Sequence, residues 1–304
     1  MTPVLGDSLL AALDLGSNSV KLLVGRLGLD GRVEVRHEEV VVTRLSEGVD
    51  RHRCLNEAAA ERTLAVLQGF SETCVRLGVE RIAAVGTSVL RDARDAAAFV
   101  DRCRPMGFEI EIIDGDTEAY VVRLAALREL PGTSEDAVVI DIGGGSSELS
   151  WAAGRESMEL GVVRLSERHI QDDPPGDEAK ATLRGIVRTR LKKLALPPSP
   201  VLVGSSATCA IMGRLHLALD HHDHARLHGL EIPTERLSRF VDTLFEAALV
   251  NRKRLPGMDP SRADVAPAGA VVLEQAALEI GAACLRINDR GTRYGVFHRA
   301  FGRP

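Results

Sequence analysis

The chain has 304 residues, of which 45% are hydrophobic and 27% charged, a composition typical of a soluble globular protein large enough for two domains. Its formal net charge of −5 argues against general nucleic-acid binding, which normally accompanies a basic excess. No apolar run approaches the roughly 20 residues that span a bilayer, and the N-terminus lacks the pattern of a secretion signal. We therefore expect neither nucleic acid nor membrane as a partner.

The cysteines also indicate a cellular compartment. There are five, an odd number, and none is placed in a Cys-x-x-Cys pair. Scattered cysteines of this kind are typical of idle thiols in a reducing compartment, so we expect a cytoplasmic protein.

The first half of the chain alternates strand and helix patterns, as in an α/β protein. Strands are predicted at 9–15, 20–27, 32–43, 81–85 and 109–113, and helices over 56–77, from about residue 90, and over 117–129. The longest helix has apolar residues three and four positions apart, and Gly78 ends it. A polar stretch at 131–136 then marks a boundary, and we place the first domain at 1–128.

The first two predicted strands enclose a turn of small residues that follows an aspartate. Asp14 ends the aliphatic run, and the turn consists of Gly16, Ser17, Asn18 and Ser19. Such a turn exposes backbone N–H groups that bind an anion, with hydroxyls beside them. The residues after it alternate between apolar and polar, so the chain returns as a strand. This excludes a Walker phosphate loop and a dinucleotide-binding fingerprint, which both need a helix after the glycines.

Two other loops of the first half follow strands. In Gly86–Ala93, small hydroxyl residues precede a helix and Arg91 can reach back to an anion, although plain capping by Thr87 or Ser88 is an alternative. In Asp114–Ala119, Glu118 lies in the first helical turn, and capping by Asp116 is the simpler interpretation from the residues alone.

The second half repeats this layout, and we place the second domain at 129–304. Strands are predicted at 137–142, 147–152, 157–163 and 201–203, a helix over 177–194, and further helices to the end. The first two of these strands again enclose a small-residue turn after an aspartate: Asp141, Gly143, Gly144, Gly145, Ser146, Ser147 and Glu148. One such turn alone is as easily an ordinary hairpin, but two with the aspartate in register favour a phosphate clamp built from two halves. The loop Gly204–Thr208 is the counterpart of Gly86–Ala93, and we assign Ser206 and Thr208 to phosphate contact.

A duplicated strand–turn–strand of this type resembles the superfamily of actin, hexokinase and the heat-shock chaperone ATPases. Within it, Leu13–Ser19 and Ile140–Leu149 are similar to the exopolyphosphatase and guanosine pentaphosphate phosphohydrolase (Ppx/GppA) family, in its short two-domain form. The resemblance extends over residues 8–297, with further matching segments at 43–49, 161–167, 262–270 and 288–296. It implies two actin-like, ribonuclease H-like domains of the ASKHA superfamily, with an interdomain cleft.

The resemblance also implies roles for single residues. The family's Thr-x-x-Leu-Arg-x-Ala segment, which helps bind phosphate, is matched by residues 87–93 and includes Arg91. In its Gly-x-Glu-Glu-Ala motif the second Glu is held to be the general base, and Glu118 aligns with it, while Thr117 replaces the first Glu. Two other departures are Ala207, where the family often has Gly, and Tyr294, where it has Glu.

These parts together predict an exopolyphosphatase that releases orthophosphate from the end of inorganic polyphosphate by direct attack of water. Glu118 is the expected catalytic residue, with Glu148 second. The carboxylates Asp14, Asp141 and Glu148 are expected to hold Mg²⁺, or Mn²⁺ in its place. The expected phosphate-binding residues are Gly16, Ser17, Asn18, Ser19, Arg91, Gly143, Gly144, Gly145, Ser146, Ser147, Ser206 and Thr208.

Other functions remain open at this point. A guanosine pentaphosphate 5'-phosphohydrolase would cut the same terminal anhydride, and guanosine tetraphosphate is a possible ligand. A sugar- or nucleotide-binding ATPase or kinase would share the two turns. A non-catalytic sensor of polyphosphate or alarmones would lack the base, so Glu118 favours an enzyme. We also expect a homodimer.

One cluster is set aside. His216, His221, His222, His224 and His228 gather around Asp220 and Asp223, and two of them are four residues apart, a spacing that zinc sites use. Because the segment is polar and has no accompanying glutamate, we interpret it as a solvated loop that binds metal only adventitiously.

Overall fold

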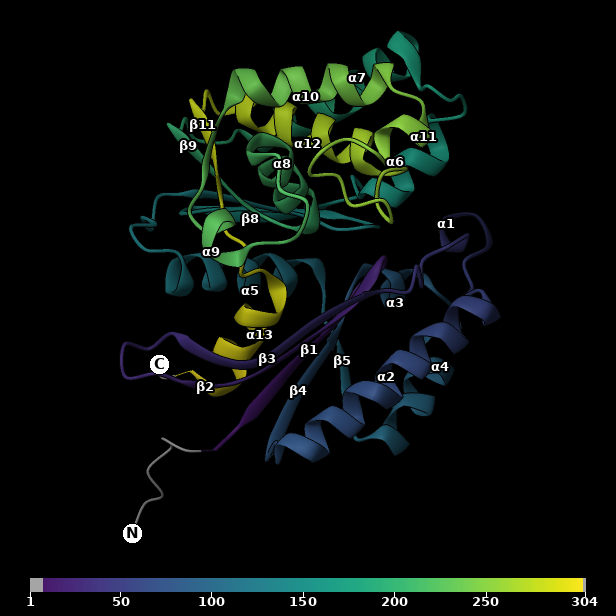
Figure 1. Cartoon of the computed structure of the whole chain (residues 1–304), viewed down its shortest axis with the longest axis vertical. Coiled ribbons are helices and arrows are strands. Elements are labelled where there is room, and N and C mark those ends of the chain that lie inside the picture. The colour runs from purple at the N-terminus through teal and green to yellow at the C-terminus, as the bar shows by residue number, and fades with distance from the viewer. Residues whose placement is uncertain (1–7, 303–304) are drawn as a thin grey trace. The chain divides into compact units, whose positions relative to one another are not determined.

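The computed structural model describes residues 8–302, which form two compact units (Figure 1). Unit 1 contains the chain up to Glu129 and again from Thr292, and unit 2 is Leu130–Gly291. The boundary near residue 129 agrees with the expected one, but the end of the chain differs. Helix α13 (Thr292–Phe301) belongs to unit 1 rather than to the second domain, because its apolar side chains complete a core beside the first sheet. Within the described residues, no helix is both long and apolar enough to cross a membrane.

Unit 1 contains a five-stranded sheet in the order β3-β2-β1-β4-β5. Its strands are β1 (Leu10–Leu15), β2 (Ser19–Leu27), β3 (Val33–Val42), β4 (Arg81–Gly86) and β5 (Ile110–Ile112). The first three pair in antiparallel fashion, and β4 and β5 continue the sheet parallel to β1. This order brings the end of β1 between the ends of β2 and β4.

Successive residues of β1 point to opposite faces of this sheet, and both faces are covered. Leu13 packs in the same cluster as Leu67 and Phe70, whereas Ala12 belongs to the cluster of Val121 and Phe297. The helices of unit 1 are α1 (Val49–His52), α2 (Glu57–Leu77), α3 (Ser88–Asp92), α4 (Ala96–Cys103), α5 (Gly115–Glu129) and α13. As a result β1 is buried along its whole length, which fixes the turn that follows it.

Unit 2 contains a six-stranded sheet in the order β10-β11-β9-β6-β7-β8. Its strands are β6 (Val138–Ile142), β7 (Ser147–Trp151), β8 (Gly154–Met158), β9 (Val201–Ser205), β10 (Glu231–Pro233) and β11 (Cys284–Ile287). Here β6, β7 and β8 pair in antiparallel fashion, and β9 and β11 continue the sheet parallel to β6. Apart from the added edge strand β10, the order and directions repeat those of unit 1, so the duplication predicted from the turns is confirmed.

Helices cover the sheet of unit 2 as well. They are α6 (Val162–His169), α7 (Gly176–Leu191), α8 (Ala207–Leu217), α9 (His224–Leu227), α10 (Thr234–Glu246), α11 (Leu249–Arg252) and α12 (Ala266–Glu279). Helix α12 is apolar on nearly every side because α7 and α10 both pack against it in the main core. Together these units have the actin-like fold that the sequence predicted.

Two expectations about unit 2 were wrong. The strand predicted at 157–163 ends at Met158, and the helix α6 begins at Val162. Leu160 faces the core from the connection, and Val162 and Leu165 face it from the helix, because Gly161 packs closely against the loop at Gly144 and Gly145. The prediction of helices alone after residue 203 also missed β10 and β11, which have only three and four residues and so give almost no periodic signal.

Candidate active site

The two small-residue turns have the same backbone geometry. The N–H of Gly16 donates to the carbonyl of Ser19 over 3.1 Å, and the N–H of Gly143 donates to the carbonyl of Ser146 over 2.9 Å. A Cβ at either glycine would lie 3.1 Å from that same carbonyl, closer than most side chains tolerate. Glycine at these two positions therefore allows the tight turn after each aspartate.

In unit 1, neighbouring backbone holds the carbonyls of the turn. The amides of Thr43 and Arg44 both donate to the carbonyl of Asn18, and the amide of Ser46 donates to that of Ser17. Within the described residues, the amides of Ser17 and Asn18 have no backbone acceptor. The turn thus keeps its acceptors engaged and presents donors, which is the arrangement that binds an anion.

In unit 2 the start of helix α6 holds the carbonyls of the turn. The amide of Val162 donates to the carbonyl of Gly143, and the amide of Val163 to that of Gly144. The buried side chain of Arg164 donates from Nε to the carbonyl of Gly145 over 2.8 Å. In the part of the chain that the structure describes, the amides of Gly144 and Gly145 have no backbone acceptor. Both turns therefore offer N–H groups by the same means.

Buried polar side chains beside the turns add to these donors. Within residues 8–302, four of them have a buried nitrogen or oxygen without a hydrogen-bond partner: Asn18 Nδ2, Thr43 Oγ1, Ser46 Oγ and Ser146 Oγ. An unsatisfied buried donor costs about 1–3 kcal/mol, so such groups are rare unless a ligand or water satisfies them. Their position at the two turns supports the predicted roles of Asn18 and Ser146.

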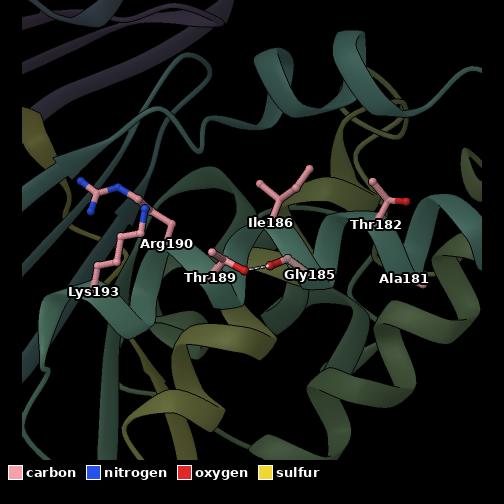
Figure 2. Close-up of a pocket in the computed structure, with 7 residues that line it drawn as sticks. All are labelled: Ala181, Thr182, Gly185, Ile186, Thr189, Arg190 and Lys193. Atoms are coloured by element: carbon pink, nitrogen blue, oxygen red, sulfur yellow. Dashed lines mark hydrogen bonds between the residues drawn. The ribbon is translucent and has the colours of Figure 1, made fainter.

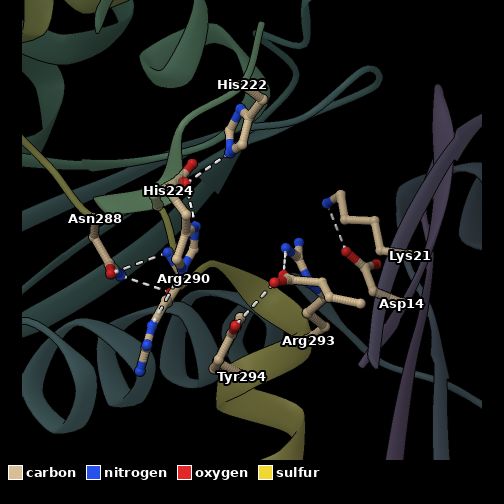
Figure 3. Close-up of polar contacts among 10 residues, drawn as sticks. Asp14, Lys21, His222, His224, Asn288, Arg290, Arg293 and Tyr294 are labelled. Atoms are coloured by element: carbon tan, nitrogen blue, oxygen red, sulfur yellow. Dashed lines mark hydrogen bonds and ion pairs between the residues drawn. The ribbon is translucent and has the colours of Figure 1, made fainter. Parts of the chain in front are cut away.

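Cationic side chains lie around Asp14, which is one of the expected metal ligands. In the antiparallel register Asp14 lies opposite Lys21, whose Nζ donates to Asp14 Oδ2 over 2.7 Å (Figure 3). Arg293 of α13 is close enough to interact electrostatically with the same carboxylate, although burial lowers the pKa of its guanidinium. A metal ion would have to compete with the Lys21 ammonium for this buried carboxylate. Metal binding by Asp14 stays a prediction.

Unit 2 has a carboxylate where unit 1 has Lys21. Asp141 lies directly opposite Glu148, so the two side chains share one face of the sheet, and they are 7% and 1% exposed. Ser157 donates its hydroxyl to Glu148 Oε1 over 2.7 Å. Buried carboxylates this close are costly without a positive charge, and hard oxygen ligands are those that Mg²⁺ prefers. The donor set at Asp141 and Glu148 therefore fits a hard divalent cation.

Arg91 and Glu118 are brought together in unit 1. Arg91 Nη1 donates to Glu118 Oε2 and to the carbonyl of Ile113, each over 2.8 Å. The Glu118 side chain is 7% exposed and that of Arg91 is 24% exposed. The expected base, Glu118, and the expected phosphate ligand, Arg91, are thus hydrogen-bonded to each other, and the guanidinium fixes the orientation of the carboxylate.

The capping alternatives for these two loops were wrong. Thr87 makes no side-chain cap to α3, and Ser88 bonds instead to the hydroxyl of Ser17 in the turn, at 2.9 Å between the oxygens. Helix α5 is capped by Asp114, whose Oδ1 accepts from the amide of Thr117 over 2.7 Å, and not by Asp116. Both loops therefore keep their functional side chains for other contacts.

The loop Gly204–Thr208 of unit 2 differs from its counterpart Gly86–Ala93, because one of its serines caps the following helix. Ser206 caps α8 by accepting from the amide of Cys209 over 3.0 Å, and its hydroxyl also contacts the sulfur of that residue. Thr208 is buried, and Gly269 of α12 leaves room for it, because a Cβ there would come within 2.8 Å of Thr208 Oγ1. The hydroxyl of Ser205 accepts from the side-chain amide of Asn288. Phosphate contact by Ser206 would compete with capping, and both assignments stay predictions.

Sequence reasoning missed several residues of this region. Lys21 could have been found by counting, because it follows Asp14 at the same spacing at which Glu148 follows Asp141. Arg164 lay in the matching segment 161–167, but its contact with the carbonyl of Gly145 could not be predicted from nearby residues. The pairing of Glu38 with both Arg293 and Tyr294 also joins residues far apart in the sequence.

A groove elsewhere contains none of the predicted site residues. It has a volume of about 540 Å³ and runs along α7 and the turn after it, where Arg190 and Lys193 lie at one end and Ala181 and Thr182 at the other (Figure 2). Its lining residues include no carboxylates. It is therefore not the candidate active site.

Comparison with known proteins agrees with this geometry. Residues 29–303 match the model of the Ppx/GppA phosphatase family. The chain belongs to this family. Exopolyphosphatase 2 of Mycobacterium tuberculosis is 31% identical over 287 residues, which cover 89% of this chain and 90% of that protein.

Solved structures of Ppx/GppA proteins are similar throughout. The Aquifex aeolicus family member is 27% identical with a TM-score of 0.83, and the match covers 96% of this chain and 97% of that one. An exopolyphosphatase from Cytophaga hutchinsonii has a TM-score of 0.84 over 97% and 98% of the two chains, and at 20% identity it supports the fold alone. The family resemblance predicted from the two turns is thus confirmed.

Proposed function

We propose that this chain is an exopolyphosphatase, which hydrolyses the terminal phosphoanhydride bond of inorganic polyphosphate and releases orthophosphate. The observation that carries the proposal is the duplicated turn, which engages its carbonyls and presents N–H groups in both units. A few phosphates of a polyanion are the ligand that such donors suit. The relative named exopolyphosphatase 2 supports the same activity.

The chemistry then follows from the residues at the turns. A water oxygen attacks the terminal phosphorus, the anhydride P–O bond breaks, and the shortened chain leaves. Glu118 orients this water and takes its proton, while Arg91 holds the carboxylate in place. The turn amides and Asn18 stabilise the charge that spreads over the phosphoryl oxygens. No covalent phosphoenzyme is needed.

We further propose that Asp141 and Glu148 hold Mg²⁺ or Mn²⁺. Their two buried carboxylates face the same side of the sheet, and Ser157 orients one of them. When bound, the ion neutralises negative charge on the phosphates. A cytoplasmic homodimer that also binds guanosine penta- or tetraphosphate completes the proposal.

Phosphate release by the pure, untagged protein tests this function. We expect release from tripolyphosphate and from moderate chains to be at least as fast as from long polyphosphate, because binding depends on a few phosphates. Guanosine pentaphosphate, which has the same terminal anhydride, is assayed beside them. A marked preference for guanosine pentaphosphate would make the nucleotide the substrate, with the same mechanism. If none of the three compounds releases phosphate, the protein binds phosphate chains without hydrolysing them.

A further inference from the structure

Much of the histidine segment of unit 2 is exposed, as the sequence indicated, but two of its histidines contact a buried carboxylate. His222 and His224, both labelled in Figure 3, lie against the carboxylate of Asp289, which comes near the end of unit 2 in the sequence. His222 Nε2 is 2.8 Å from Asp289 Oδ2, and His224 Nδ1 is 2.5 Å from the same oxygen. These three atoms lie within 4.8 Å of one another. Two imidazoles and one carboxylate are a common ligand set for zinc.

The segments that carry these side chains are firmly held. Asp289 follows β11, and its neighbour Asn288 is fully buried, with its side-chain amide donating to Ser205 Oγ and to the carbonyl of Arg290, each over 2.8 Å. The histidines precede and begin α9, and the loop after that helix pairs with Ile287 of β11 through both the amide and the carbonyl of Ile287. The site is therefore built on one strand and its partner loop.

Burial is graded in a way that suits an ion with one open position. The side chain of Asp289 is 6% exposed, that of His224 33% and that of His222 49%. With bonds of about 2.0–2.1 Å, a tetrahedral zinc ion separates its ligand atoms by roughly 3.3 Å. Small outward movements of the two rings would thus admit the ion, with the open side left for water.

We propose that His222, His224 and Asp289 form a site for a borderline divalent metal ion, of the zinc class, that is separate from the phosphate turns. Imidazole nitrogen favours zinc or cobalt over magnesium, which prefers oxygen alone. The ion fixes the segment from Asn288 to Gly291, where the chain leaves unit 2 for helix α13.

Arg290 gives the site a second consequence. Its Nε lies 3.4 Å from His224 Nε2, which acts as the acceptor when Nδ1 carries the proton toward Asp289. A metal ion on Nδ1 moves the ring proton to Nε2, so Nε2 no longer accepts. Metal binding therefore releases the Arg290 guanidinium from this ring.

Cobalt and zinc binding by the full-length, untagged protein tests the proposal. The protein is stripped with a chelator and titrated with Co²⁺ in a buffer without phosphate, with millimolar Mg²⁺ present to occupy oxygen-only sites. We expect the visible absorption of tetrahedral cobalt, displaced by about one equivalent of Zn²⁺ per chain. In His224→Gln and Asp289→Asn the apparent Kd should rise at least about 100-fold.

Two variants serve as controls, and a third replaces Asp289→Asn if that variant misfolds. His221→Gln removes an exposed histidine that contacts only its neighbour Asp220 in the described structure, and Asp141→Asn alters the turn carboxylates. Both should bind cobalt as the parent does. If Asp289→Asn fails to fold, His222→Gln, at a half-exposed ring, replaces it. Absence of the tetrahedral spectrum in the parent, or equal binding by the parent and His224→Gln, would overturn the site and leave a hydrogen-bonded cluster.

Discussion

Replacing Glu118 by Gln separates the chemistry of the base from the structure of its ion pair. The amide oxygen still accepts from Arg91 Nη1, so the contact over 2.8 Å persists without its charge. The difference between a charge-assisted and a neutral hydrogen bond is about 1 kcal/mol, which lowers the melting temperature of a chain of this size by roughly 2–4 °C. Loss of a general base costs about 10²-fold or more in rate, equivalent to about 2.7 kcal/mol in activation free energy.

The assay measures kcat for phosphate release from tripolyphosphate together with thermal unfolding. Substrate binding, followed by the protection that polyphosphate gives against unfolding, should persist in the variant. Glu111→Gln is the matched control, because Glu111 is an exposed carboxylate of unit 1 that pairs with Arg299. Its kcat should equal that of the parent. A Glu118→Gln protein that keeps more than about a tenth of the parent kcat would remove Glu118 from the role of base.

Three other changes test the turns. Asp141→Asn should raise the Mg²⁺ concentration needed for half-maximal activity, and full activity in excess chelator would contradict a metal at this carboxylate. Lys21→Met removes the ammonium that hydrogen-bonds to the buried carboxylate of Asp14 and should lower the free energy of unfolding by about 2–4 kcal/mol in denaturant titrations, whereas Lys21→Arg should restore most of it. Gly161→Ala places a Cβ 2.2 Å from backbone and should abolish both stability and activity, while Gly185→Ala, with open space around it, should be neutral or slightly stabilising; equal melting temperatures would refute this packing argument.

Much of the fold could be predicted because the duplicated pattern is local. Each turn follows a buried strand and precedes an alternating one, so the hairpins around Asp14 and Asp141 were predictable from consecutive residues. The actin-like fold of the two units followed from the resemblance. Helix α13 was assigned to the wrong unit because only tertiary packing, here of Tyr294 and Phe297 against the first sheet, decides where a terminal helix lies.

The sequence indicated candidate site residues one by one, but not which of them contact each other. Residue types at strand ends indicated Arg91 and Glu118 separately, whereas their mutual hydrogen bond depends on how α3 and α5 are placed. The role of Asp289 was hidden for the same reason, since it lies far along the chain from His222 and His224. Local patterns predict which residues reach a strand end, and long-range packing decides which of them meet.

The position of helix α13 has a consequence for how the protein is made. Val296 and Phe297 pack in one apolar cluster with Leu10 and Ala12 of the first sheet and with Val121 of α5. During synthesis α5 is the helix that covers this face of the sheet first, and the part that α13 covers stays open until residues 130–291 have also been made. A nascent chain that ends at residue 129 should therefore expose apolar surface and bind chaperones. Adding residues 292–301 as a separate peptide should make that fragment soluble. Helix α13 would then be the element that completes the core of unit 1 last.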